Sequence, residues 1–203
     1  FLFKGTVYSS GGYSALYGQA MSSVLLLESI DLPDKTSASL GISYLSANGG
    51  IQKLAKNKKS SWGLSYAYVN VGLVYSLIKQ SADYFKVPEV HELDGNFRIK
   101  TRHGMVKYYG YFSAMKLGYR YANIDSAGLK NAFSLNNVNY YHNVSWKEKL
   151  GKGWKIQLGG SYSNNQDKIR NELNNLQNEK IGETGNPLYD YQNFRLKNNG
   201  HYV

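Results

Sequence analysis

Between residues 137 and 163, apolar and polar side chains alternate with a period of two, and the alternation is interrupted only by the turn 150–153. Before the turn, one face carries mainly asparagine, serine and lysine. The other face carries Val138, Tyr140, His142, Val144 and Trp146. A period of two is typical of β-strands, and Gly-Lys-Gly is a sequence that closes tight hairpins. This segment is therefore predicted to be an antiparallel hairpin of long strands with one apolar face.

The same alternation predicts strands elsewhere in the chain. They are expected at 37–44, 61–68, 96–100 and 106–114, with a weaker one at 51–55 and a possible last one beginning at 199. The pattern changes phase near Val69 and near Met115, which predicts either β-bulges or strands that leave a membrane. The count is seven strands, or eight with the last.

Composition favours a membrane barrel over other folds with the same period. The chain has 203 residues with 19 Tyr, 21 Gly, 3 Pro and no Cys, and no apolar run is longer than Val24–Leu27. Only every second residue of a membrane-spanning strand faces lipid, so such a chain needs no long apolar run. A soluble β-sandwich would also alternate, but it seldom needs strands of more than about ten residues. The predicted fold class is an all-β, antiparallel transmembrane β-barrel.

Connection lengths give this barrel an orientation. Short turns are predicted at 56–60, 102–104 and 150–153, and they alternate with long connections at 79–94, 122–136 and 166–198. A single short connection, 46–50, falls among the long ones. Outer-membrane barrels have short periplasmic turns and long external loops. An aromatic rim is predicted at the periplasmic interface, where amphipathic rings collect, and it consists of Trp62, Trp146 and Trp154.

No enzyme site is expected. The four histidines, His91, His103, His142 and His201, are far apart and lack a metal-ligand spacing, and no nucleophile or phosphate-loop motif occurs. No catalytic residue, metal ligand or cofactor is therefore predicted, and His142 is expected on the apolar face. No ligand-binding residues are predicted either.

Two polar segments are predicted to be external loops. One gathers Asp83, Glu89, Glu92 and Asp94, which are expected to be solvated, with a calcium site as the alternative. The other, 164–178, has Ile169, Leu173 and Leu176 at helical spacing, which predicts a short loop helix.

The formal net charge of +10 does not point to nucleic acid, because the basic residues are scattered and no nucleic-acid-binding motif is present. A lipopolysaccharide-rich leaflet is one anionic neighbour that suits such a chain.

The first 35 residues do not follow the strand pattern. The segment Gly11–Ala20 reads GGYSALYGQA and resembles the end of the plug domain of TonB-dependent outer-membrane receptors. The motif residues are Gly11, Gly12, Tyr13, Tyr17, Gly18 and Gln19. The segments 56–62 and 161–165 look like receptors of the Bacteroidota. The resemblance implies a last plug strand at 23–29, a plug end and linker at 1–35, and the first barrel strands at 36–203.

The resemblance also implies a location and a function. Such receptors have about 22 strands, so this chain would supply roughly the first third of a barrel in the bacterial outer membrane. They take up a scarce solute, such as a siderophore or a cofactor, when an inner-membrane energy-coupling protein pulls on the plug through a region before Phe1. The alternatives are a structural or assembly subunit among other outer-membrane proteins and a small closed barrel.

A group of basic residues is expected to face the lumen near the periplasmic end, where it either contacts acidic groups of the plug or is solvated. It comprises Arg98, Lys100, Lys147, Lys149 and Lys155.

Overall fold

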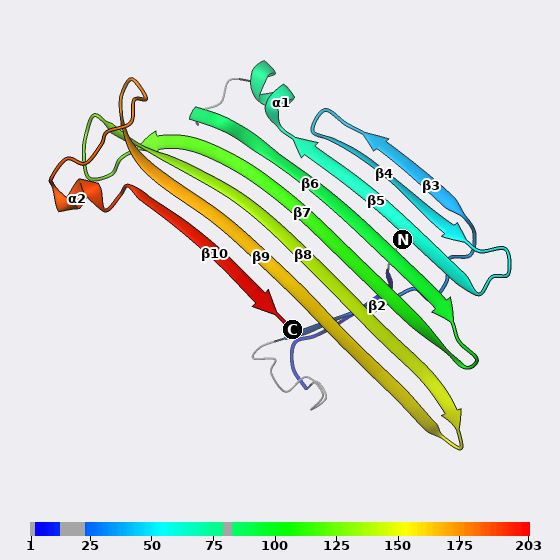
Figure 1. Ribbon diagram of the computed structural model, residues 1–203. Coiled ribbons are helices and arrows are strands. Elements are labelled where there is room, and N and C mark those ends of the chain that lie inside the picture. Colours follow the sequence, from blue (N-terminus) through cyan, green and yellow to red (C-terminus); the bar gives the residue numbers. More distant parts are fainter. Residues whose placement is uncertain (1–2, 13–22, 79–82) are drawn as a thin grey trace.

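The computed structural model of the chain describes residues 3–12, 23–78 and 83–203. In these segments the protein is built from two antiparallel sheets and two short helices, α1 (Gly72–Leu77) and α2 (Pro187–Asp190) (Figure 1). The smaller sheet pairs β1 (Phe3–Ser9) with β2 (Val24–Ser29). The predicted all-β class is therefore confirmed, and the larger sheet is antiparallel as expected. None of the helices in the described part of the chain is long and apolar enough to cross a membrane.

The larger sheet has eight strands, and each one pairs with its neighbours in the sequence, in the order β10 to β3. The strands are β3 (Ser37–Ile42), β4 (Ser46–Leu54), β5 (Ser60–Asn70), β6 (Asp83–Lys100), β7 (Gly104–Ala122), β8 (Leu129–Gly151), β9 (Trp154–Asn175) and β10 (Phe194–Tyr202). These strands contain the segments in which apolar and polar side chains alternate. The predicted hairpin is confirmed, and its two strands are β8 and β9. At its turn Gly151, Lys152 and Gly153 have φ angles of 91°, 50° and 82°. Glycine adopts such angles without strain.

The strands β6 to β9 are longer than expected, at 18 to 23 residues. The long connections predicted at 79–94, 122–136 and 166–198 are therefore wrong in extent, because strands continue into each of them. The loop helix predicted in 164–178 is also wrong, since β9 continues to Asn175. Ile169 and Leu173 are four residues apart, a spacing that places two side chains on one face of either a helix or a strand.

Two other predicted connections are strand instead. The four acidic residues assigned to a loop all lie in β6, and the connection predicted at 46–50 is the first half of β4. The turn before β4 is closed by a hydrogen bond of 2.7 Å from the Ser43 amide to the Ser46 carbonyl. The small residues and glycines in the first half of β4 weaken the apolar–polar alternation, which explains why this part of the strand was predicted to be a connection.

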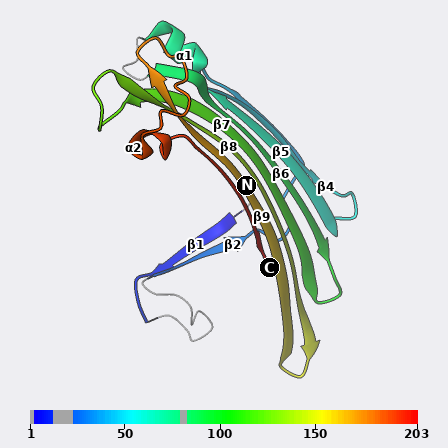
Figure 2. The same cartoon turned by 60° about the vertical axis from the view of Figure 1, so that its left-hand side comes forward.

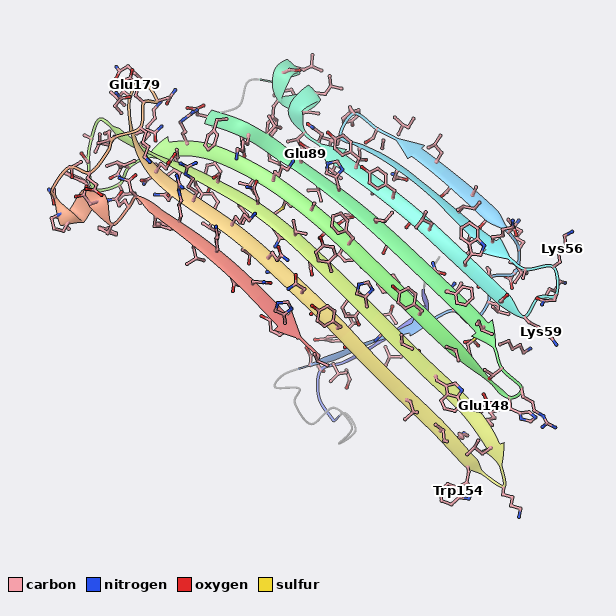
Figure 3. The ribbon with its side chains drawn as sticks, viewed as in Figure 1. Lys56, Lys59, Glu89, Glu148, Trp154 and Glu179 are labelled. Carbon is pink, nitrogen blue, oxygen red and sulfur yellow. The ribbon has the colours of Figure 1, made fainter. Side chains whose placement is uncertain are left out.

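The large sheet curves, and the hairpin β1–β2 lies on its concave side (Figure 2). Lys107 in β7 reaches that hairpin, so the odd-numbered residues of β7 point to the concave face and the even-numbered ones to the convex face. The short turns β4–β5, β6–β7 and β8–β9 all lie at one end of the sheet, called here the turn end, and the opposite end is the loop end. Figure 3 shows Lys56, Lys59 and Trp154 at the turn end and Glu179 at the loop end.

Candidate functional site: the two faces of the sheet

An apolar band crosses the convex face from β3 to β9 and is called the apolar belt. Its side chains stand on neighbouring strands in register; Phe97 pairs with Tyr108, and Tyr108 with Val144. One member from each strand is Leu40, Ile51, Leu64, Phe97, Tyr108, Val144 and Leu158. Leu40 is 80% exposed and Leu158 is 58% exposed. Aliphatic and aromatic side chains are thus exposed together over a continuous surface, which marks an interaction site.

On β7 the height of the belt is close to that of the apolar band of outer-membrane barrels. On β7 its convex positions run from Val106 to Ala114 and include no charged residue. At about 3.3 Å per residue this stretch is about 30 Å long. With a strand tilt of about 45° it covers ~21 Å, close to the band of about 25 Å found on outer-membrane barrels.

Several polar groups of the convex face are paired with one another, and His91 also contacts the Glu89 carboxylate at 2.7 Å. Three histidines on the convex face each hydrogen-bond to a tyrosine of a neighbouring strand, at 2.7 to 2.9 Å. The pairs are Tyr66–His91, Tyr108–His142 and Tyr162–His201. An unpaired polar group is costly in an apolar environment, so such pairs suit a dry surface. No cluster of three or more His, Asp or Glu side chains suited to a metal occurs within the described segments.

The concave face opposite the belt is polar. Asp94 accepts hydrogen bonds from the hydroxyls of Ser65, at 3.2 Å, and Tyr109, and Glu92 accepts one from Tyr111 at 3.0 Å. A hollow of about 470 Å³ adjoins these groups and is lined by Tyr109, Tyr111, Asn139, Tyr141, Ser163 and Asn165. Aromatic rings stand there beside amide and hydroxyl groups, so the hollow offers both ring faces and hydrogen-bonding groups.

Nearer the turn end, a second cavity of about 540 Å³ separates the large sheet from the end of β2 and is called the linker cavity. Lys107 contributes an ammonium group that lies 2.8 Å from a carboxylate oxygen of Asp31. The same ammonium group donates to the carbonyl oxygen of Ser29 at 3.0 Å. The linker cavity is therefore bordered by a charged contact between β7 and the segment just after β2.

The predicted basic residues are only partly brought together. Four of them line the linker cavity, namely Lys100, Lys147, Lys149 and Lys155. Arg98 does not line it; its side chain is 3% exposed and donates to the Asn96 amide oxygen at 2.8 Å. Lys107, which makes the contact to Asp31, was missed. Its place on the polar face of 106–114 was visible in the alternation.

The three predicted rim tryptophans lie toward the turn end, in β5, β8 and β9. Trp62 is 43% exposed and Trp154 is 74% exposed. The Trp146 indole donates to Glu148 at 3.3 Å, and Glu148 also accepts bonds from the Thr101 hydroxyl and, at 2.8 Å, the His103 amide. Glu148 thereby fastens the β6–β7 turn to β8 beside the indole.

The plug-end motif is described only at its start. Gly11 and Gly12 follow β1, and Gly12 has a φ of 68°. Tyr13, Tyr17, Gly18 and Gln19 lie outside the described residues. The strand predicted at 23–29 is present as β2, and β1, for which no strand was predicted, is its partner.

A cluster of buried amides at the loop end was not foreseen either. Asn171 donates to the Gln192 carbonyl at 2.8 Å and to the Asn131 side chain at 3.4 Å, and Asn123 bonds both Asn131 and Gln192. These four side chains are at most 8% exposed. They attach the segment after α2 to β8 and β9. The cluster joins residues that are far apart in the chain, so no local sequence pattern marks it.

Comparisons with known proteins add nothing to the evidence for a function, which therefore rests on this geometry. A scan of protein-family models, a search of curated proteins and a search of solved structures each find no match to this chain. The likeness of residues 11–20 to a plug end therefore stays a prediction from the sequence.

Proposed function

We propose that this chain forms part of an outer-membrane β-barrel that takes up a scarce solute, with the N-terminal segment belonging to a plug that seals the barrel. The single observation that carries the proposal is the apolar belt. A continuous band of exposed apolar side chains, close in height to the apolar band of outer-membrane barrels, has a natural partner in lipid.

The concave face supports the second half of the proposal. Its carboxylates, amides and hydroxyls suit a water-filled or plugged lumen rather than a protein core. The hairpin β1–β2 stands on this face and is held there by Lys107. A barrel of this kind leaves a pore, so a segment inside it must block the pore, and uptake then requires work transmitted to that segment.

The membrane part is tested with single cysteines, because the chain has none of its own. Leu64→Cys and Ser65→Cys place a spin label on opposite faces of β5, in the full-length protein reconstituted into lipid. The label at 64 should collide with oxygen dissolved in the bilayer, and the label at 65 with a water-soluble nickel chelate. Equal access of both labels to the chelate would refute a lipid-facing belt.

The transport part is tested in a strain that lacks the gene. Uptake of radiolabelled siderophores and corrinoid cofactors is compared before and after the full-length gene is restored, with and without a protonophore. Energy-dependent uptake that returns with the gene supports the proposal. If every solute enters equally well in both strains and the protein co-purifies with stoichiometric partners, a structural subunit of a larger outer-membrane complex is the better description.

A further inference from the structure

At the loop end, the convex face changes from apolar to basic within one step along the strands. Ala114 in β7 and Val138 in β8 stand in the last apolar row of those strands. Two residues further along β7 is Lys116, which pairs with Asn136, and Asn136 pairs with Lys168 in β9. Consecutive rows on one face are about 7 Å apart. Basic side chains therefore begin immediately beyond the belt on β7 and β9. On β6 the residue paired with Lys116 is Glu89, whose carboxylate contacts His91 at 2.7 Å.

Like charges are neighbours in this region. Lys168 pairs directly with Lys197 of β10, and in the next row Arg170 pairs with Arg195. Like charges directly opposite each other in a sheet repel and destabilise the pair. The pairing across β7 to β10 has no register shift there, so both pairs stay on the convex face.

Most of these cations have no partner in the described part of the protein. Arg170 contacts Glu172 at 2.6 Å. The side chains of Lys116, Lys168, Arg195 and Lys197 are exposed and form neither a hydrogen bond nor an ion pair with any described residue. The repulsion between Lys168 and Lys197 is thus not relieved within this part of the protein, whereas Glu172 offsets the charge of Arg170 beside Arg195.

The concave side of the same rows is apolar. Leu117 pairs with Leu135, and Leu135 pairs with Ile169, all on the face opposite the cations. In these rows the concave face is therefore apolar and the convex face basic, the reverse of the arrangement at the belt. On a strand that leaves the hydrocarbon layer, the outward side chains meet the head-group region instead of lipid tails.

We propose that Lys116, Lys168, Arg170, Arg195 and Lys197, named the basic rows, bind the phosphate groups of a phosphorylated glycolipid in the outer leaflet. The inference rests on the proposed function, since it needs the belt to lie in a membrane. The basic rows are at the depth where lipid phosphates begin, directly beyond the last apolar row. Lysine and arginine are the side chains that pair with phosphate, and arginine can do so through two parallel hydrogen bonds.

Their position favours a lipid over other anions. A nucleic acid or an acidic protein could meet the exposed cations, but it would leave the apolar side chains beside them uncovered. The basic rows adjoin Tyr140 and Val138, so an acyl chain can lie on the belt while its phosphate reaches Lys116 or Lys168. A phosphate between Lys168 and Lys197 would also remove their mutual repulsion.

The test uses the full-length protein in nanodiscs and diphosphoryl lipid A as the probe, with retained lipid measured by native mass spectrometry. The variant Lys116→Gln/Lys168→Gln/Lys197→Gln removes three charges from the basic rows. Its control, Lys56→Gln/Lys58→Gln/Lys59→Gln, removes three exposed charges at the turn end (Figure 3). The first variant should bind lipid A about ten-fold or more weakly, and the control should bind as the unaltered protein does.

Two results would overturn the proposal. One is equal retention by both variants, and the other is equal retention of lipid A from which the phosphates have been removed. Heat-modifiable migration on gels verifies that each variant is folded. If the glycolipid site is refuted, the spin-label result at residues 64 and 65 still stands on its own. Failure of the glycolipid site is therefore distinguishable from failure of the membrane assignment.

Discussion

Lys107 of β7 and Asp31, which lies just beyond β2, form an ion pair with the ammonium nitrogen 2.8 Å from the carboxylate oxygen. Lys107 also donates to the hydroxyl of Ser29 at 3.1 Å. A single side chain of the large sheet thus binds the end of the small sheet at three groups. Its own position is fixed by the pairing of β7 with β6 and β8.

Replacing this side chain should loosen the small sheet and leave the large sheet intact. In Lys107→Met, backbone amides in 23–36 should exchange hydrogen faster, because the contacts to Ser29 and Asp31 are lost. Global stability should change by less than about 1 kcal/mol, since Asp31 is largely exposed and its ion pair is screened. Hydrogen-exchange mass spectrometry measures both the local exchange rates and the global stability. Lys149→Met, in the same cavity, is the control, and equal exchange in the two variants would contradict the assignment.

A charge placed in the belt should be far more harmful than one placed beside it. Val144 is 49% exposed on the convex face, so an arginine there would have room in a water-soluble protein. In a bilayer, Val144→Arg should destabilise the folded barrel by about 2–4 kcal/mol. Asn143→Arg, on the concave face, should cost much less. Urea unfolding in liposomes gives both values, and equal values would argue against a lipid-facing belt.

The buried amide cluster should stabilise the loop end. Asn171→Leu keeps the size of the side chain but leaves the Gln192 carbonyl without its donor, which should cost about 1–3 kcal/mol. Thermal unfolding in detergent micelles measures the change. Asn198→Leu is the matched control, because Asn198 is exposed and its side chain makes no hydrogen bond to the described residues. An equal loss of stability in the control would mean that the amide cluster does not stabilise the loop end more than an exposed asparagine does.

The loop that contains α2 should respond to acid. Thr184 donates its amide, at 2.7 Å, and its hydroxyl, at 2.8 Å, to Asp190, and these bonds lower the pKa of that carboxyl below its ordinary value. The stabilisation is therefore present above the ordinary pKa of about 3.9 and is lost as the pH falls through the lower, folded value.

A spin label on Leu188→Cys, a position that is 69% exposed, reports this change. Its mobility should rise below a pH of about 4. With Asp190→Asn added, the label should already be mobile at neutral pH and show little dependence on pH. Adding Asp34→Asn instead should alter nothing, and a pH response that survives Asp190→Asn would assign the change to another group.

The sequence predicted the strands best where one face is uniformly apolar. From Val138 to Trp146 and from Trp154 to Tyr162 the alternation placed both strands and their turn. Beyond Met115 the apolar side chains move to the concave face, so a rule that follows one face takes the strand to end there. The contact of Lys107 with Asp31 joins segments far apart in the chain, and only the three-dimensional structure could reveal it.

At the loop end, the strands of the large sheet end in two different rows, as their lengths and register show. β5 ends at Asn70, which pairs with Glu89, and β4 and β3 end close to the same row. β7 and β8 remain paired as far as Ala122 and Lys130, several rows further on. The edge is therefore a step, low along β3 to β5 and high along β7 to β9. In the proposed uptake barrel, a solute that approached over the low side would reach Asp94 and Tyr109 by the shorter path, whereas the high side would shield them.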